Sequence, residues 1–119
     1  MIAFNVCDDE QYFVDKITAD TEKWRKRYEE SCPDPRVNVI DGYVGPGYGR
    51  ADTAVYDSIR HVAQLEGIVF DPVYTGKAFA AMQTEINAGR FDGASDLVFL
   101  HTGGIFGLFP HRDQLVPEP

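Results

Sequence analysis

Hydrophobic residues in this chain occur in two patterns, short continuous runs and longer segments with helical spacing. Largely apolar runs at residues 2–6 and 37–40, each interrupted by one Asn, and continuous apolar runs at 68–70 and 97–100 predict short buried strands. The segments between them repeat apolar residues every three or four positions, as amphipathic helices do. The alternation of strands and helices predicts an α/β fold, with a parallel sheet flanked by helices in a three-layer αβα arrangement.

The first predicted helix follows Asp8 or Asp9, either of which can cap its N-terminus. Charges of both signs fill one face, so we interpret that face as solvated rather than as a basic patch. The opposite face is apolar and is expected to pack inward; it consists of Phe13, Ile17, Trp24 and Tyr28.

Two further helices and a C-terminal segment complete the predicted domain, which spans residues 1–119. The second helix begins at Asp52 or Thr53 and ends at Gly67, a residue typical of helix C-termini. The third helix runs from about residue 75 to 88. A last short helix over 105–109 is expected to precede a flexible tail over 110–119.

Residues 67–79 carry the clearest candidate site. The apolar run 68–70 predicts a strand that Asp71 and Pro72 terminate, and Tyr74 and Thr75 then open a helix. In open α/β sheets, ligands bind beside the carboxyl ends of strands, next to helix N-termini. The alternative is purely structural, with Tyr74 as a packing residue and Thr75 as a helix cap.

The loop 42–49 contains four glycines and two tyrosines, which is unusual for a simple connector. Glycine allows a backbone to turn tightly or to approach a ligand closely. The loop does not match the dinucleotide-binding fingerprint, because Arg50 stands where the third glycine belongs. Gly76-Lys77 does not match a phosphate-binding P-loop, because Ala78 replaces the Ser or Thr. The loop is therefore either a functional segment or a surface excursion.

Composition and charge argue against several classes of function. A net charge of −8 argues against nucleic-acid binding, and no apolar run approaches the ~20 residues that cross a bilayer. The N-terminus lacks the features of a signal peptide, so we expect a cytoplasmic protein that binds no membrane. Cys7 and Cys32 are expected to be unlinked thiols, and the three histidines are spaced too irregularly to predict a metal site.

Three motifs, in order and at similar spacing, match one group of enzymes. They are Pro46-Gly47-Tyr48-Gly49, the segment 66–78 with Asp71-Pro72-Val73-Tyr74-Thr75-Gly76-Lys77-Ala78, and His101-Thr102-Gly103-Gly104. The chain resembles the C-terminal part of the D-cysteine desulfhydrase and 1-aminocyclopropane-1-carboxylate deaminase family. These are pyridoxal-phosphate enzymes of fold type II, like the tryptophan synthase β subunit. The resemblance extends from the first strand to about residue 109.

The resemblance implies roles for individual residues. Tyr74 is similar to an active-site tyrosine that stands near the substrate amine and the reacting carbons, and Tyr48 is similar to a second tyrosine facing the same substrate. Thr75 corresponds to a hydroxyl that meets the pyridine nitrogen of the cofactor. The loop that starts at His101 resembles one that lines the cofactor ring, which implies cofactor-binding roles for Thr75, His101, Thr102 and Gly103.

Position 75 distinguishes the two activities within this family. The deaminases have Glu there, which keeps the pyridine nitrogen protonated and makes the ring a strong electron sink, whereas a neutral hydroxyl leaves a weaker one. Opening a cyclopropane needs the strong sink, but elimination of a thiolate does not. Thr75, together with Thr102 where the deaminases tend to have Leu, favours desulfhydrase-like β-elimination from D-cysteine or a related amino acid.

Two parts of these longer enzymes have no counterpart in this sequence, the Schiff-base lysine in its Gly-Asn-Lys-type context and the phosphate-binding loop. Of the four lysines, three lie on a polar helix face and Lys77 belongs to a different motif. We therefore expect weak or no binding of pyridoxal phosphate by this chain alone, and an N-terminal partner segment or a homo-oligomer. Two alternatives are a non-catalytic α/β oligomerising module and a deaminase-like activity.

Overall fold

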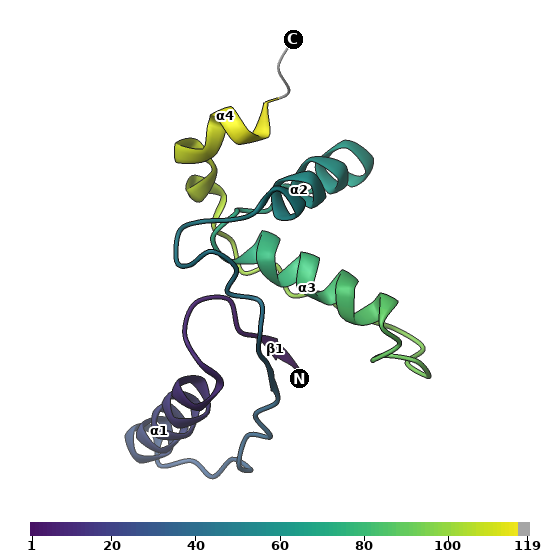
Figure 1. The fold of residues 1–119 in the computed structure, drawn as a ribbon. Helices are drawn as coiled ribbons and strands as arrows, with labels where there is room; N and C mark the ends of the chain where they lie inside the picture. The colour runs from purple at the N-terminus through teal and green to yellow at the C-terminus, as the bar shows by residue number, and fades with distance from the viewer. Residues whose placement is uncertain (117–119) are drawn as a thin grey trace.

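The computed structural model describes residues 1–116 of the chain. It contains a small parallel sheet, three long helices and a C-terminal pair of short helical segments (Figure 1). In chain order these elements are β1 (Ala3–Phe4), α1 (Glu10–Tyr28), β2 (Val39–Ile40), α2 (Thr53–Glu66), α3 (Thr75–Asn87), the 3₁₀ helix η1 (Ile105–His111) and α4 (Arg112–Leu115).

The sheet consists of β1 and β2, which pair in parallel with Ala3 opposite Val39 and Phe4 opposite Ile40. Its hydrogen bonds continue past the strand ends, because the Asn5 amide donates to the Ile40 carbonyl at 2.8 Å. The α/β class with parallel strands is thus confirmed, and α3 packs against β1. Both strands are shorter than the apolar runs 2–6 and 37–40 predicted.

The prediction of strands at 68–70 and 97–100 is wrong. Within residues 1–116, neither segment pairs with another strand. A strand is stabilised by hydrogen bonds to another strand, and hydrophobicity alone does not supply that partner. Phe70 instead packs into the helical core, and Val98 remains 92% exposed. The apolar run 97–100 therefore leaves an uncovered apolar surface rather than a central strand.

The core lies between α2 and α3. Tight packing requires the glycine at position 76, because a Cβ there would lie 2.6 Å from the Asp71 carbonyl and 2.7 Å from Ile59 Cδ1. The fully buried apolar members of this core are Val55, Ile59, Val62 and Phe70, and Phe79, Phe99, Leu108 and Leu115 pack against them.

Helix α1 lies apart from this core, at the bottom of Figure 1, where it contacts β2. Asp9 caps it by accepting a hydrogen bond from the Tyr12 amide at 2.8 Å, and Glu29 ends it in the left-handed conformation. None of its residues is buried. The inward face expected for this helix is only partly covered, since Trp24 and Tyr28 remain exposed and contact each other with tilted rings.

The C-terminal segment is more ordered than predicted. The helix expected over 105–109 continues as η1 and then α4, and Leu115 packs against the core, so residues 110–115 are not a tail. Residues 117–119 lie outside the described part. The radius of gyration is 16.4 Å, compared with about 13–14 Å for a compact domain of this length. Within the described residues, no helix combines the length and hydropathy that a bilayer crossing requires.

Candidate functional site

Two tyrosines from distant parts of the chain meet at one point. Tyr48, in the glycine-rich loop, and Tyr74, just before α3, place their hydroxyl oxygens 2.7 Å apart. Their rings approach edge to face, with centroids 6.0 Å apart. The hydrogen bond to Tyr48 is the main cause that raises the pKa of Tyr74 to about 12. The two predicted catalytic residues are therefore brought together, although their roles remain predictions.

Thr75 is buried beside a carboxylate. Its hydroxyl donates to Asp71 Oδ2 at 2.6 Å and accepts from the Asp71 amide at 3.0 Å. Asp71 is 1% exposed, and its carboxylate also accepts from the amides of Val73, Tyr74 and Thr75. The side chain of Asp71 thereby fixes the turn that begins α3. Because the single hydroxyl proton of Thr75 goes to Asp71, the Thr75 oxygen retains one lone pair for a further donor.

The loop that follows residue 100 lies against the same turn. His101 stacks on Phe70, and its Nε2 lies 3.0 Å from the Val69 carbonyl. Because the Gly103 amide donates to His101 Nδ1 at 3.1 Å, Nε2 carries the proton and donates to Val69. Gly104 has a φ of 95°, and a Cβ at this position would lie 2.5 Å from Asp71 Oδ2. The contacts of His101 and Gly103 thus fix the conformation of the loop. In this conformation the loop lies against the side chain of Asp71.

A cavity of about 610 Å³ opens beside these residues. Tyr74, Thr75, Asp96 and Thr102 are the polar residues that line it, and apolar residues of β1, α3 and the segment 97–100, with Phe91, form most of the remaining walls. Mostly apolar cavities with a few convergent polar groups are typical of small-molecule sites. Of the four residues with predicted cofactor contacts, Thr75 and Thr102 line this cavity. His101 and Gly103 do not line it, but they hydrogen-bond to each other within the adjoining loop.

Sequence reasoning missed two residues of this region. Asp71 was expected only to end a strand, yet its carboxylate organises the whole turn. The signal was present, because an Asp two to four residues before a helix start accepts amide bonds there. Lys77 is buried in α3, and its amine donates to the carbonyls of Val44 and Gly47 in the glycine-rich loop. No periodicity distinguishes such a lysine from a surface one.

The cavity fits one part of a pyridoxal-phosphate site. Thr75 and Thr102 offer hydroxyl groups to the edge of a flat ring. The amine of Lys77 is engaged elsewhere and does not line this cavity, and the other three lysines are on α1. Hence the side chains that line this cavity can contact the ring, and no lysine is among them.

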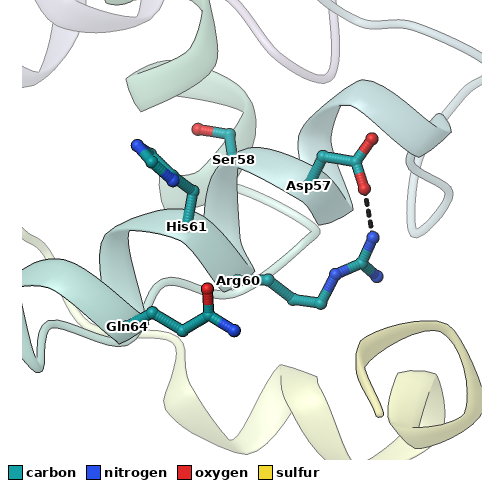
Figure 2. A pocket seen from close by; sticks show the side chains of 5 residues that line it. All are labelled: Asp57, Ser58, Arg60, His61 and Gln64. Atoms are coloured by element: carbon teal, nitrogen blue, oxygen red, sulfur yellow. Dashed lines mark hydrogen bonds and ion pairs between the residues drawn. The ribbon is translucent and has the colours of Figure 1, made fainter. Parts of the chain in front are cut away.

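Another surface hollow lies on α2, away from these residues. Figure 2 shows its five side chains, all from one helix, with Arg60 turned back to pair with Asp57. Ser58 donates to Gln83 of α3, and Arg60 donates to the Gln114 carbonyl of α4. We interpret this patch as a set of structural contacts between helices. Among residues 1–116, no three potential metal ligands cluster.

Comparisons with known proteins agree with this geometry. The sequence is 40% identical over 108 residues to a putative 1-aminocyclopropane-1-carboxylate deaminase from Thermotoga maritima, which covers 88% of this chain and 32% of that protein. It is also 40% identical over 79 residues to D-cysteine desulfhydrase from Salmonella newport, which covers 66% of this chain and 24% of that enzyme.

A solved structure extends the similarity to the fold. The crystal structure of an ACC deaminase homologue superposes with a TM-score of 0.81 at 30% identity, over 96% of this chain and 34% of that chain. The chain thus spans about a third of the length of such relatives. A family model described as pyridoxal-phosphate dependent enzyme matches residues 13–103. The chain therefore belongs to the family of pyridoxal-phosphate dependent enzymes, in which it shares the fold of the 1-aminocyclopropane-1-carboxylate deaminase homologues.

Proposed function

We propose that this chain forms one wall of the active site of a pyridoxal-phosphate dependent lyase. The reaction would convert D-cysteine, or a related amino acid, and water into pyruvate, ammonia and hydrogen sulfide. A polypeptide that supplies the Schiff-base lysine and the phosphate loop would complete the site. The observation that carries the proposal is the meeting of the Tyr48 and Tyr74 hydroxyls beside the cavity that Thr75 lines.

In this proposal the two tyrosines orient the substrate through hydrogen bonds. Tyr74 lines the cavity, and Tyr48 contacts its hydroxyl from the loop. With its pKa raised to about 12, Tyr74 keeps its proton at neutral pH and acts as a hydrogen-bond donor rather than as a base. Such a donor is suited to holding a substrate group through a hydrogen bond.

Thr75 and Thr102 would contact the cofactor ring. Bound pyridoxal phosphate supplies an electron sink that stabilises negative charge on the substrate α-carbon. The neutral side chain at position 75 favours the weaker sink, which is sufficient when a thiolate leaves with its electrons. This assignment favours β-elimination over cyclopropane opening.

A deaminase-like activity is the second candidate, and one contact favours it. Because the Thr75 proton is donated to Asp71, Thr75 offers the ring a lone pair. An acceptor at that point favours a protonated ring nitrogen, which strengthens the sink. Asp71 would then act on the ring through Thr75, much as a carboxylate acts directly.

Complementation tests both candidates. The chain is mixed with the remaining two thirds of the Thermotoga maritima relative and pyridoxal phosphate, and then given D-cysteine or 1-aminocyclopropane-1-carboxylate. β-Elimination predicts pyruvate and sulfide from D-cysteine, whereas deaminase activity predicts 2-oxobutanoate and ammonia from the cyclopropane. No product from either substrate in a mixture that binds the cofactor would contradict the proposal.

Matched variants separate the two roles. Tyr74→Phe should reduce turnover by about 100-fold, the low end of the loss when one preorganised hydrogen-bond donor is removed. Asp71→Asn should lower deamination more than elimination if the Asp71–Thr75 bond controls the ring nitrogen. His61→Gln, on the exposed surface of α2, serves as the control and should leave both rates unchanged.

A further inference from the structure

The amine of Lys77 holds the glycine-rich loop against α3. Its Nζ donates to the Val44 carbonyl at 2.6 Å and to the Gly47 carbonyl at 2.9 Å. These two carbonyls lie on either side of Gly45-Pro46, so one amine bridges the turn. The Gly47 carbonyl also accepts from the Arg50 amide at 3.2 Å. Gly47 adopts a φ of 123°, which permits this bend.

The start of this loop is held by a separate contact, in which the Tyr43 hydroxyl donates to Glu85 of α3 at 2.6 Å, so Lys77 concerns the end that carries Tyr48. Tyr48 directly follows Gly47 and is 67% exposed, yet its hydroxyl reaches that of Tyr74, which is itself 42% exposed. Packing therefore does not hold the Tyr48 side chain. Tyr74 is the N-cap residue of α3, and Lys77 lies in the first turn of that helix. The amine that binds the loop and the phenol that the loop must reach are thus three residues apart at the start of α3.

Burial of the Lys77 amine costs desolvation free energy, which its contacts must offset. The side chain is 3% exposed, and desolvation lowers the pKa of its amine. Within residues 1–116 its amine makes no ion pair with a carboxylate, although the charge of Asp52 favours the protonated form. A buried ammonium without such a pair is retained only where hydrogen bonds compensate it. Here the compensating acceptors are the two loop carbonyls.

We infer that Lys77 is a positioning residue, which fixes the loop 42–50 on α3 and thereby sets the contact between the Tyr48 and Tyr74 hydroxyls. It is distinct from the lysine that would bind the cofactor, since its amine is directed into the loop. The importance of this contact for catalysis rests on the proposed function. The contact itself can be tested on the chain alone, without cofactor or substrate.

The test follows Tyr74 by NMR in the chain labelled with carbon-13 at the tyrosine Cζ, with Tyr48→Phe and Tyr74→Phe to assign the signals. In the wild-type chain Tyr74 should titrate at about 12, and Tyr48→Phe should return the value toward 10. Lys77→Met should have the same effect as Tyr48→Phe. The other titratable groups near the pair are Cys7 and Asp71, which these variants retain.

The direction of the shift separates positioning from simple charge. Because the pKa of the Lys77 amine is lowered from its ordinary 10.5, this amine is neutral at the pH where Tyr74 titrates. Loss of its charge would therefore leave the pKa of Tyr74 unchanged, whereas loss of the N–H groups that hold the loop predicts a fall. Lys77→Gln keeps N–H donors without the charge and should retain part of the elevated value. Lys26→Met on α1 is the matched control and should change nothing.

Either outcome of the Lys77→Met titration tests the positioning role of Lys77. A Lys77→Met chain that keeps its helical circular dichroism and its elevated Tyr74 pKa would overturn the inference. Should Lys77→Met fail to fold, the wild-type chain provides the answer: cross-relaxation between the Lys77 ε-protons and the Gly47 α-protons supports the contact, and its absence contradicts it. Since neither measurement uses cofactor, failure of the proposed lyase activity would leave this outcome unaffected.

Discussion

Helices α1 and α2 are both amphipathic, but they are stabilised in different ways. The longer helix, α1, buries none of its 19 residues, whereas α2 buries Val55, Tyr56, Ile59 and Val62 among its 14. Each begins with an Asp cap, at Asp9 and Asp52. Local signals are therefore sufficient to start both helices, but α1 makes only partly buried contacts, whereas α2 and its neighbour α3 contain buried residues. The candidate site is built on the packed region.

Removal of a core side chain should show this difference most strongly. Ile59→Ala should lower the free energy of unfolding by about 3 kcal/mol, because it leaves a cavity between α2 and α3. Ile17→Ala in α1 is the matched change and should cost about 1 kcal/mol or less, since the side chain is only half-buried. Urea denaturation measures both. Equal losses would show that α1 is packed as well as α2.

The two helix starts provide the next comparison. Asp71→Ala removes four hydrogen bonds to a buried carboxylate and should cost about 2–3 kcal/mol. Asp9→Ala removes one exposed cap and should cost about 1 kcal/mol. Thermal denaturation followed by circular dichroism measures each loss. A cost for Asp71→Ala no greater than for Asp9→Ala would contradict the central role of Asp71.

A smaller effect concerns pH. Because folding raises the pKa of Tyr74 from 10.0 to about 12, the native chain retains a proton that the unfolded chain loses. The stability contributed by this group is complete below pH 10 and is lost as the pH rises through about 12. Tyr48→Phe should reduce this loss, as seen in denaturation midpoints across that range. Tyr28→Phe in α1 is the control, and a similar change in that variant would refute the assignment to the pair.

The smallest effect is expected for the ion pair between Lys16 and Asp20 on α1. Both side chains are exposed, and such pairs contribute little because water and salt screen them. Lys16→Met should leave the urea midpoint unchanged within error. A loss comparable to that of Asp9→Ala would indicate that this surface pair stabilises α1 as much as the cap does.

Helices were predictable from this sequence because their signals are local. Asp9, Asp52 and Gly67 act at the ends where the pattern placed them, and the third helix begins at Thr75 as predicted. The tyrosine pair followed from motif resemblance rather than from periodicity. The two tyrosines are 26 positions apart in the sequence, and no local sequence pattern connects residues at that separation.

Strands were less predictable, because they depend on partners. The runs 68–70 and 97–100 are as apolar as a buried strand, yet pairing is decided by what lies beside them. Lys77 and Asp71 were missed for a related reason. Their polar groups are satisfied by backbone atoms of a loop and a turn, and the sequence does not record which carbonyls or amides the fold brings near.

Binding of pyridoxal phosphate by complementary pieces tests the central claim most directly, namely that this chain is one wall of a divided cofactor site. Equilibrium dialysis compares the chain, the remaining two thirds of the Thermotoga maritima relative, and their mixture, with Thr102→Val as a variant of the cavity wall. The account predicts binding by the mixture well above that of either piece, and weaker binding with the variant. Binding by the mixture no greater than by the complementing piece alone would contradict it.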